Sequence, residues 1–252
     1  MSILRKLRLL GRSGRRAPAG FDAVLEPDAS FFAIGDIHGQ MAELIRALAA
    51  IRDATERPTI VCVGDYIDRG ERSADVLRHL RGMAQQRGAA FTCLMGNHEQ
   101  MCLRFLDDPE NSGDRWFRNG GLQTLASFGV QLGPRQSKAN IRDTLAQAMG
   151  DNLIAWLRGL PCYWVSGNVA VTHAGADPLQ PIAGQPDRNL LWGHPAFQTT
   201  PRTDGMWVVH GHTIVDQPQV QSGRIAIDTG AYATGRLTVA HITGDGVSFV
   251  TT

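Results

Sequence analysis

Apolar residues in the first hundred positions form three short runs, each ending in a glycine followed by polar residues. The runs are Ser30–Ile34, Thr59–Val63 and Phe91–Met95. Between them, apolar positions recur every three or four residues around 44–51 and 76–83, which is the spacing of amphipathic helices. Buried strands that alternate with helices of this length indicate βαβ units with parallel strands, so we expect an α/β fold.

The second half of the chain changes first to a helical pattern and then back to strands. Apolar-bearing stretches at Leu103–Leu106, Leu122–Phe128 and Ile141–Leu157 predict a mostly helical insertion over 100–161. Strands are expected afterwards at Val169–Thr172, Met206–Val209, Arg224–Ile227, Leu237–His241 and Val247–Val250. The last three are short and separated by turn signals, so we expect part of a second sheet to be antiparallel.

The composition is that of an ordinary globular protein and excludes a general attraction to polyanions. Of 252 residues, 43% are hydrophobic and 19% charged, and the formal net charge is +1. We therefore expect no nucleic-acid partner. No apolar run approaches the roughly 18 residues that a membrane span needs, so no membrane partner is expected either. Segment 1–20 is rich in arginine and is interpreted as a basic, solvated tail, which leaves 21–252 as one domain.

The four cysteines do not form a disulfide framework. Cys62, Cys93, Cys102 and Cys162 show no C-x-x-C pair, and the first two lie inside apolar runs. Free, mostly buried thiols are expected, which favours a reducing compartment such as the cytoplasm.

Residues that can bind metal ions follow the predicted strands. They are Asp36 and His38, Asp65, Asn97 and His98, His173, and His212. Imidazole, carboxylate and amide ligands without sulfur suit manganese, iron or zinc. Because such a set exceeds the needs of one tetrahedral ion, we expect two divalent ions that share a carboxylate, about 3.5–4 Å apart. The strand ends of an open α/β sheet are also the usual ligand-binding edge.

The loops that carry these residues resemble the motifs of a known family. Gly35–Gly39, Gly64–Gly70 and Gly96–Glu99 are similar to the three signature motifs of the phosphoprotein phosphatases, which are calcineurin-like metallophosphoesterases. Thr172–Gly175 and Gly211–Thr213 resemble the two later metal-binding histidine segments, and 116–129 resembles the small bacterial and bacteriophage members. The resemblance implies a β-sandwich of two mixed sheets flanked by helices.

The resemblance also implies a role for each matching residue. The metal ligands would be Asp36, His38, Asp65, Asn97, His173 and His212, with Asp65 bridging both ions. A hydroxide between the ions, most readily two Mn²⁺ with iron or zinc as alternatives, would attack the phosphorus. His98 would protonate the leaving group, oriented by Asp68, and Arg69 would bind a phosphate oxygen. His210 is expected beside the ligands rather than among them.

One position departs from the family pattern. Members commonly carry a second phosphate-binding arginine shortly after a Leu-Trp pair, but Leu191-Trp192 is followed here by Gly193-His194. His194 is therefore expected to take that role, with Arg188 or Arg202 as alternatives from the same region.

Three functions compete. A serine/threonine protein phosphatase is the main prediction, because Asp68 and Glu99 distinguish the chain from the usual pattern of dinucleotide tetraphosphatases. The alternative is hydrolysis of a dinucleotide polyphosphate such as diadenosine tetraphosphate. A non-catalytic binding module is disfavoured by the intact ligand set. The expected partner is thus a phosphoprotein or a phosphorylated small molecule.

Overall fold

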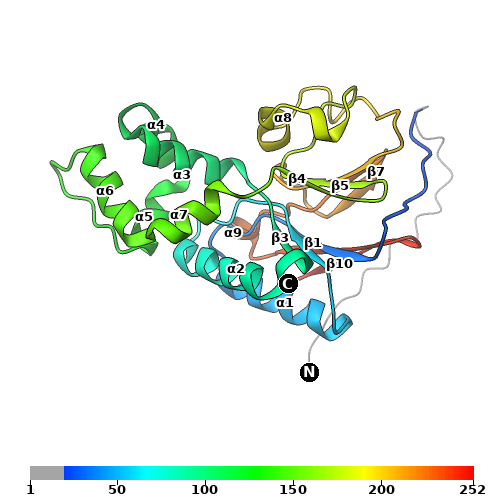
Figure 1. The fold of residues 1–252 in the computed structure, drawn as a ribbon, viewed down its shortest axis with the longest axis horizontal. Helices are drawn as coiled ribbons and strands as arrows, with labels where there is room; N and C mark the ends of the chain where they lie inside the picture. Colours follow the sequence, from blue (N-terminus) through cyan, green and yellow to red (C-terminus); the bar gives the residue numbers. More distant parts are fainter. Residues whose placement is uncertain (1–19) are drawn as a thin grey trace.

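A computed structural model describes residues 20–252, in which two β-sheets lie beside a group of helices (Figure 1). The strands are β1 (Phe31–Ile34), β2 (Ile60–Cys62), β3 (Phe91–Cys93), β4 (Tyr163–Ser166), β5 (Val169–Thr172), β6 (Trp207–His210), β7 (Gln219–Gln221), β8 (Arg224–Ala226), β9 (Thr238–Thr243) and β10 (Gly246–Thr251). The α-helices are α1 (Met41–Ala54), α2 (Ser73–Arg87), α3 (Asn97–Asp107), α4 (Pro109–Trp116), α5 (Leu122–Ser127), α6 (Lys138–Met149), α7 (Asp151–Arg158), α8 (Asp187–Trp192) and α9 (Ala231–Thr234). Shorter turns are the 3₁₀ segments η1 (Gly88–Ala90) and η3 (Ile182–Gly184) and the π-turn η2 (Phe117–Gly121).

Both sheets are mixed, as predicted. The first has the order β10-β9-β1-β2-β3, with β1, β2 and β3 parallel and β9 antiparallel to both of its neighbours. The second has the order β4-β5-β6-β8-β7, with β5, β6 and β8 parallel and the two edge strands antiparallel. The parallel strands extend from the centre to one edge of the first sheet and form the centre of the second, and within each sheet their carboxyl ends point the same way.

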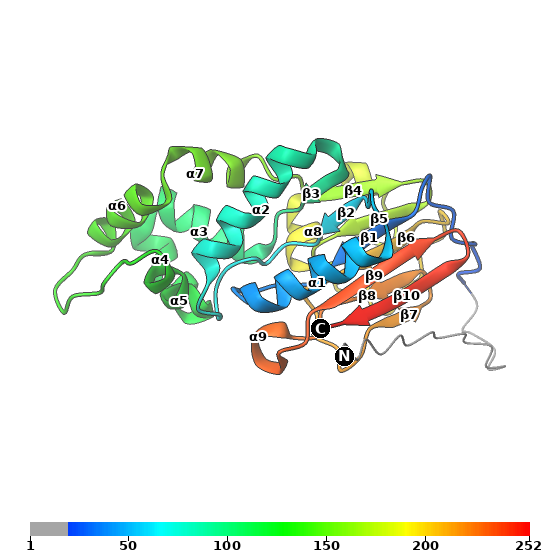
Figure 2. The ribbon, with the colours of Figure 1, turned by 90° about the horizontal axis from the view of Figure 1, so that it is seen from below.

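The sheets form a sandwich with helices on its outer faces. On β1, Phe31 and Ala33 pack toward the second sheet, where they join Val171 and Val209 in one buried cluster. The intervening Phe32 and Ile34 belong to the cluster that packs with α1 and α2. This alternation follows the two-residue period of a strand, and burial on both faces explains why the run is continuously apolar. Figure 2 shows α1 and α2 in front of the sheet that contains β9 and β10.

Two predicted strands lie in a different sheet from the one expected, and two further strands, β4 and β7, were not predicted. The runs expected at Leu237–His241 and Val247–Val250 form β9 and β10, which join the first sheet along β1 rather than the second sheet. The antiparallel pairs of the second sheet come instead from β4 and β7, which lie at its edges. Val220 of β7 is exposed between two glutamines, so this edge strand lacks the apolar pattern that predicts burial.

Between α3 and α7 the chain forms a helical group at the left of Figure 1. Asp108 accepts a hydrogen bond from the Asn111 N–H and is followed by Pro109, which sets the start of α4. Gly150, at φ 75°, separates α6 from α7, so the apolar stretch 141–157 is two helices. Leu145 and Leu157 of these helices are fully buried.

The basic segment expected over 1–20 lies outside the described residues apart from Gly20. The cysteines are free, and three of the four are buried. None of the helices within 20–252 combines the length and the apolarity that crossing a bilayer requires.

Candidate metal centre and active site

The predicted metal ligands converge from both sheets. Asp36, Asp65 and Asn97 follow β1, β2 and β3 of the first sheet, whereas His173 and His212 follow β5 and β6 of the second. All five are buried except His212, which is partly exposed. The two sets of strand ends therefore meet at one buried point.

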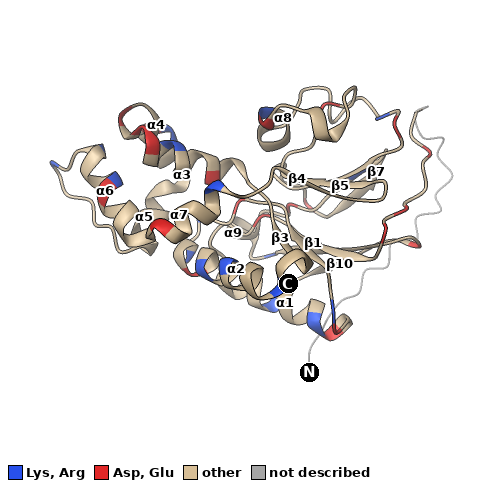
Figure 3. Ribbon diagram, viewed as in Figure 1, with Lys and Arg blue, Asp and Glu red and all other residues tan. Residues whose placement is uncertain are grey.

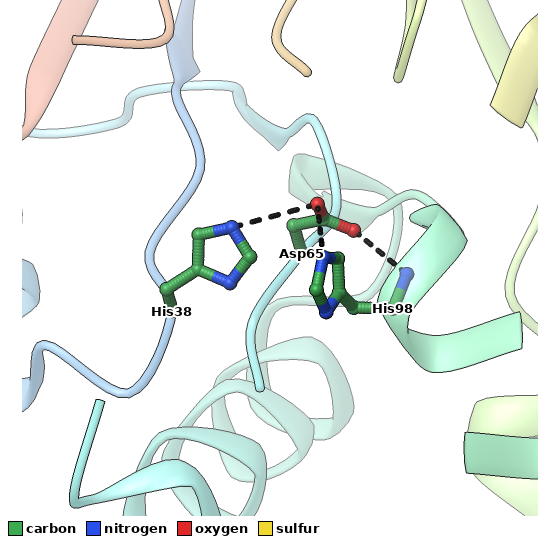
Figure 4. A group of neighbouring side chains, drawn as sticks. All are labelled: His38, Asp65 and His98. Atoms are coloured by element: carbon green, nitrogen blue, oxygen red, sulfur yellow. Dashed lines mark hydrogen bonds and ion pairs between the residues drawn. The ribbon is translucent and has the colours of Figure 1, made fainter. Parts of the chain in front are cut away.

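Asp65 lies at the centre of this cluster. Its Oδ2 lies 3.6 Å from His38 Nε2, and its Oδ1 lies 3.4 Å from His173 Nε2. Two groups of potential metal-binding atoms share this carboxylate, one with His38 and His98 and the other with His173 and His212. Figure 4 shows Asp65 between the rings of His38 and His98. A carboxylate with imidazoles on both sides is what two neighbouring cations would require of a shared ligand.

The histidine rings are held so that one nitrogen faces the cluster. His38 Nδ1 is 2.7 Å from the Ile67 carbonyl and His173 Nδ1 is 3.1 Å from the Val63 carbonyl, so Nε2 of each ring points at Asp65. A backbone partner on the far nitrogen fixes the tautomer in this way in many metal sites. Burial lowers the pKa of His38 to about 3, which keeps the ring neutral and able to bind a cation.

Asn97 joins the second group. Its Oδ1 lies 2.8 Å from His173 Nε2 and 2.9 Å from His212 Nδ1. Burial lowers the pKa of His212 to about 4, so this ring is also neutral. An amide oxygen and two neutral imidazoles around a shared carboxylate fit one divalent ion of borderline hardness.

Asp36 supplies independent evidence for a bound cation. Its Oδ2 accepts a hydrogen bond from the His212 N–H at 3.0 Å, while its Oδ1 is the one buried side-chain oxygen or nitrogen within 20–252 that has no partner. Burial raises the pKa of this carboxyl well above its ordinary value, and the nearby Asp228 and Asp65 raise it further. Uncompensated buried carboxylates are costly, and a cation would supply the missing partner. The residues present therefore fit a metal centre.

Backbone strain is concentrated at the same residues. Positive φ values occur in the described chain at six non-glycine residues, of which Ser222 is the only one that was not singled out from the sequence. The other five are His38, Asp65, Asp68, Arg69 and His212. Non-glycine residues rarely adopt this conformation, and its clustering here is typical of a functional site.

His98 and Asp68 form the pair expected from the sequence. His98 Nδ1 is 2.6 Å from Asp68 Oδ2, and its Nε2 lies 3.8 Å from Asp65 Oδ2. Burial opposes the charged form of His98, but the carboxylates of Asp65 and Asp68 together raise its pKa above the ordinary value. The ring is thereby favoured as a proton donor beside the cluster.

The helical group holds Asp68 in place, a feature that the sequence analysis missed. Trp116 donates its indole N–H to the carboxylate at 3.0 Å, and the Thr124 hydroxyl donates at 2.6 Å. Burial raises the pKa of Asp68, whereas these hydrogen bonds and the one from His98 favour its ionised form. The segment 116–129 had been noted only for its family resemblance. The sequence signal for the contact with Asp68 was a tryptophan and a threonine within this segment, two side chains that can donate a hydrogen bond.

Glu99 is a second positioning residue that was missed. Its carboxylate accepts hydrogen bonds from the backbone N–H groups of Asp65, Tyr66 and Gly96, at 2.8, 2.8 and 3.0 Å. Burial raises the pKa of this carboxyl to about 7. Glu99 belongs to the third motif, Gly96–Glu99, and its hydrogen bonds to Asp65 and Tyr66 hold the second motif, Gly64–Gly70, against it.

Arg69 points into the site, as predicted. Its guanidinium nitrogens lie 3.3 Å from His38 Nε2 and 3.1 Å from His98 Nε2. The Tyr232 ring, which the sequence analysis did not identify, lies 4.7 Å from the guanidinium carbon and 5.4 Å from the centre of the His38 ring. Asp228 is a further buried residue that the sequence analysis missed. It follows β8 as Asp36 follows β1, so a search for polar residues after each predicted strand would have found it.

The three candidates for the second phosphate-binding residue lie in different surroundings. His194 lies near Asp177, with 3.8 Å between Nε2 and Oδ2, and its Nδ1 accepts a hydrogen bond from the Ala196 N–H. Arg202 is buried and donates to Asp204 and to the carbonyls of Asp177 and Gln180, so it does not reach the cluster. Arg188 lines a groove together with Gln100, three residues beyond Asn97.

His210 belongs to neither group of potential metal-binding atoms. Its ring contacts Phe197 with 4.9 Å between centroids, and burial lowers its pKa to about 4. The loop after β6 begins with Gly211, because a side chain at this position would collide with Asp36 Oδ1.

The sequence and the fold are similar to those of known proteins. The family model for calcineurin-like phosphoesterases matches residues 29–215. An asymmetrical bis(5'-nucleosyl)-tetraphosphatase, PrpE of Bacillus velezensis, is 29% identical over 81% of this chain and 86% of its own length. A symmetrical bis(5'-nucleosyl)-tetraphosphatase of Methylococcus capsulatus is 31% identical over 59% of this chain, and the match spans only 44% of that protein.

Solved structures share the fold. A protein provisionally described as a diadenosine tetraphosphatase has a TM-score of 0.61 at 22% identity, covering 91% of this chain and 98% of that one. A serine/threonine phosphatase from Saccharomyces cerevisiae has a TM-score of 0.57 at 19% identity, covering 89% and 80%. The matched family model covers well over half of the sequence, including all six predicted metal ligands. The chain belongs to the calcineurin-like phosphoesterase family.

Proposed function

We propose that this chain hydrolyses dinucleoside tetraphosphates at a centre of two divalent cations. The choice of substrate rests on the curated relatives. They are named bis(5'-nucleosyl)-tetraphosphatases, and one of them matches over most of both chains. This favours the alternative over the protein-phosphatase function that was the main prediction. Membership of the phosphoesterase family supports hydrolysis at phosphorus as the reaction.

The cations would be held by two ligand groups that share Asp65. His38, with Asp36, would hold one ion, and Asn97, His173 and His212 would hold the other. Two such ions, held by these residues, would lower the pKa of a bound water molecule and neutralise charge on the phosphate oxygens. We propose Mn²⁺ as the ion, because neutral imidazoles mixed with oxygen ligands suit it, with iron or zinc as alternatives.

The protein's own groups then act on the phosphate and on the leaving group. Arg69 presents a planar guanidinium beside the cluster, where it can donate two hydrogen bonds to phosphate oxygens. His98, protonated because of Asp68 and Asp65, donates a proton to the departing oxygen. One water molecule is consumed for each phosphorus–oxygen bond broken, which gives either ATP and AMP or two ADP from diadenosine tetraphosphate.

A second candidate, hydrolysis of phosphoserine or phosphothreonine, is favoured by one observation. An alkoxide is a very poor leaving group, and the His98–Asp68 pair provides the proton donor that it needs. The leaving nucleotide of a tetraphosphate is a stabilised anion and depends less on such a donor. The two substrates therefore make different demands on the same pair.

The test is a direct assay of the purified chain with Mn²⁺ on diadenosine tetraphosphate, with separation of the nucleotide products. We expect ATP and AMP or ADP to form, and we expect Asp65→Asn to abolish the reaction. Arg52→Gln, on the far end of α1, serves as the control and should retain full activity. Turnover of a phosphothreonine peptide with no nucleotide product would replace the proposal with the second candidate.

A further inference from the structure

A groove runs between α3, α4 and α8, and its lining begins about one turn along α3 from the predicted metal ligand Asn97. It has a volume of about 500 Å³ and is lined by Gln100, Arg104, Arg115, Asp187, Arg188 and Trp192. Figure 3 marks the Lys and Arg positions of these helices in blue and their acidic positions in red. We call it the basic groove.

The arginines of the basic groove form no ion pairs with the rest of the described chain. Arg104, Arg115 and Arg188 are exposed, and across residues 20–252 none of their guanidinium groups lies within 4.0 Å of a carboxylate oxygen. Asp187 is the one acidic residue of the lining. Three cations against one carboxylate give a local excess of positive charge in a chain whose net charge is only +1. Such a surface attracts a multiply charged anion.

Helix α3 connects the groove to the reaction centre. Asn97, Gln100 and Arg104 are spaced by three and four residues, so they share one face of the helix. At 1.5 Å per residue, the stripe extends about 10 Å away from the metal ligands. An extended anion with one end at the cluster would therefore reach the arginines.

The floor of the groove is fixed by contacts of Trp192. Its indole N–H donates a hydrogen bond to Gln100 Oε1 at 2.8 Å, which ties α8 to α3. The Arg115 guanidinium lies 4.3 Å from the Trp192 ring, a cation–π contact that orders this side chain. Two walls of the groove are thus connected without using the charge of Arg104 or Arg188.

We propose that the basic groove binds the phosphate chain beyond the bond that is cleaved, and so selects polyphosphates over phosphomonoesters. Arg104 and Arg188 act as donors to the distal phosphate oxygens, and Arg115 adds positive charge from the opposite wall. The identity of the anion as part of a dinucleotide rests on the proposed function. The positive groove itself would bind any linear polyphosphate.

The test uses the full chain with Mn²⁺ in excess and two readouts. The first is the ratio of kcat/KM for diadenosine tetraphosphate to that for p-nitrophenyl phosphate. The second is inhibition of p-nitrophenyl phosphate hydrolysis by inorganic tripolyphosphate at constant free Mn²⁺. Arg104→Gln/Arg188→Gln should lower the ratio about tenfold and weaken the inhibition by a similar factor, because two charge-assisted contacts are lost. The control Arg52→Gln/Arg135→Gln removes two exposed charges elsewhere and should change neither readout.

The outcomes separate the groove from the proposed function. If diadenosine tetraphosphate is hydrolysed but the groove variant matches the parent in both readouts, the groove proposal is overturned and the function stands. If the parent does not hydrolyse the dinucleotide but the variant resists tripolyphosphate, the function fails and the polyphosphate site stands. A variant that loses only activity on an acidic phosphothreonine peptide would assign the groove to a phosphoprotein and overturn the proposal. Equal melting temperatures of parent and variant establish that both are folded.

Discussion

Asp36 is the clearest example of a side chain that the fold holds in an electrostatically unfavourable environment. Its carboxyl is buried, has one oxygen without a partner, and lies near Asp65 and Asp228, so its pKa is well above the ordinary value. Residues that destabilise the metal-free protein in this way are expected where ligand binding compensates the cost.

This predicts how the stability of the metal-free chain depends on pH. Because the pKa of Asp36 is raised on folding, the folded state binds the proton more tightly, so the contribution of Asp36 to stability is greatest below the ordinary carboxyl pKa and is lost as pH rises through the folded value. Asp36→Asn removes this titration and should flatten the decline while weakening metal binding. Urea unfolding in chelator from pH 4 to 8 measures it. An unchanged slope in the variant would contradict the assignment.

His98 is the second residue with a specific prediction. His98→Asn should keep its metal but lose roughly 10²–10⁴-fold in kcat on alkyl phosphates. The loss should be smaller on p-nitrophenyl phosphate, because its leaving phenolate hardly needs a proton. Parallel kinetics on the two substrates, with metal analysis, make the comparison. Equal losses on both would mean that His98 positions the substrate rather than protonating the leaving group.

At the scale of elements, helices remote from the sheets tune the reaction centre. The contacts from α4 and α5 to Asp68 come from Trp116 and Thr124, which lie 48 and 56 residues away in sequence. The apolar pattern predicted helices here, but no local pattern could reveal which side chains reach Asp68. The same limitation explains why β9 and β10 were assigned to the wrong sheet, since strand partners are set by long-range packing.

Thr124→Val tests this link between elements. Loss of the hydroxyl removes its hydrogen bond to Asp68 Oδ1, which keeps the one from the Trp116 indole N–H, so the melting temperature should fall by an amount that corresponds to about 1.5–3 kcal/mol for a lost hydrogen bond to a charged group. With one donor fewer, the Asp68 carboxylate interacts more strongly with protonated His98, so the high-pH limb of kcat/KM should shift to higher pH. Thr144→Val, on α6 outside the site, is the matched control. A stable variant with an unshifted pH profile would show that Thr124 does not act through Asp68.

For the whole molecule, the centre joins two sheets that otherwise meet through apolar packing. Strand ends, glycines and alternating polar residues were enough to predict an α/β fold and the residues that converge, because parallel strands place their carboxyl ends together. The sandwich of two mixed sheets was implied by the family resemblance. The sequence patterns did not reveal Tyr232 or the basic groove. These features depend on how α8, α9 and the helical group lie against the sheets.

Metal ions bound by ligands from both sheets should stabilise the fold as a unit. Saturation at 100 times the dissociation constant contributes about 2.7 kcal/mol, which corresponds to a rise of roughly 5–11 °C in melting temperature for a chain of this size. Differential scanning fluorimetry with Mn²⁺ and with chelator measures the rise. No difference between the two conditions would mean that the cluster does not bind the ion in the folded state.

The metal content of the purified chain tests the two-ion centre most directly. Parent, His212→Ala and Asp65→Asn proteins would be loaded with Mn²⁺, freed of excess ion and measured by mass spectrometry of the metal. Because Asp65 lies between both ligand groups and His212 belongs to one, we expect about two ions in the parent, about one in His212→Ala and less than one in Asp65→Asn. Retention of two ions by Asp65→Asn would contradict the shared carboxylate and, with it, the proposed mechanism.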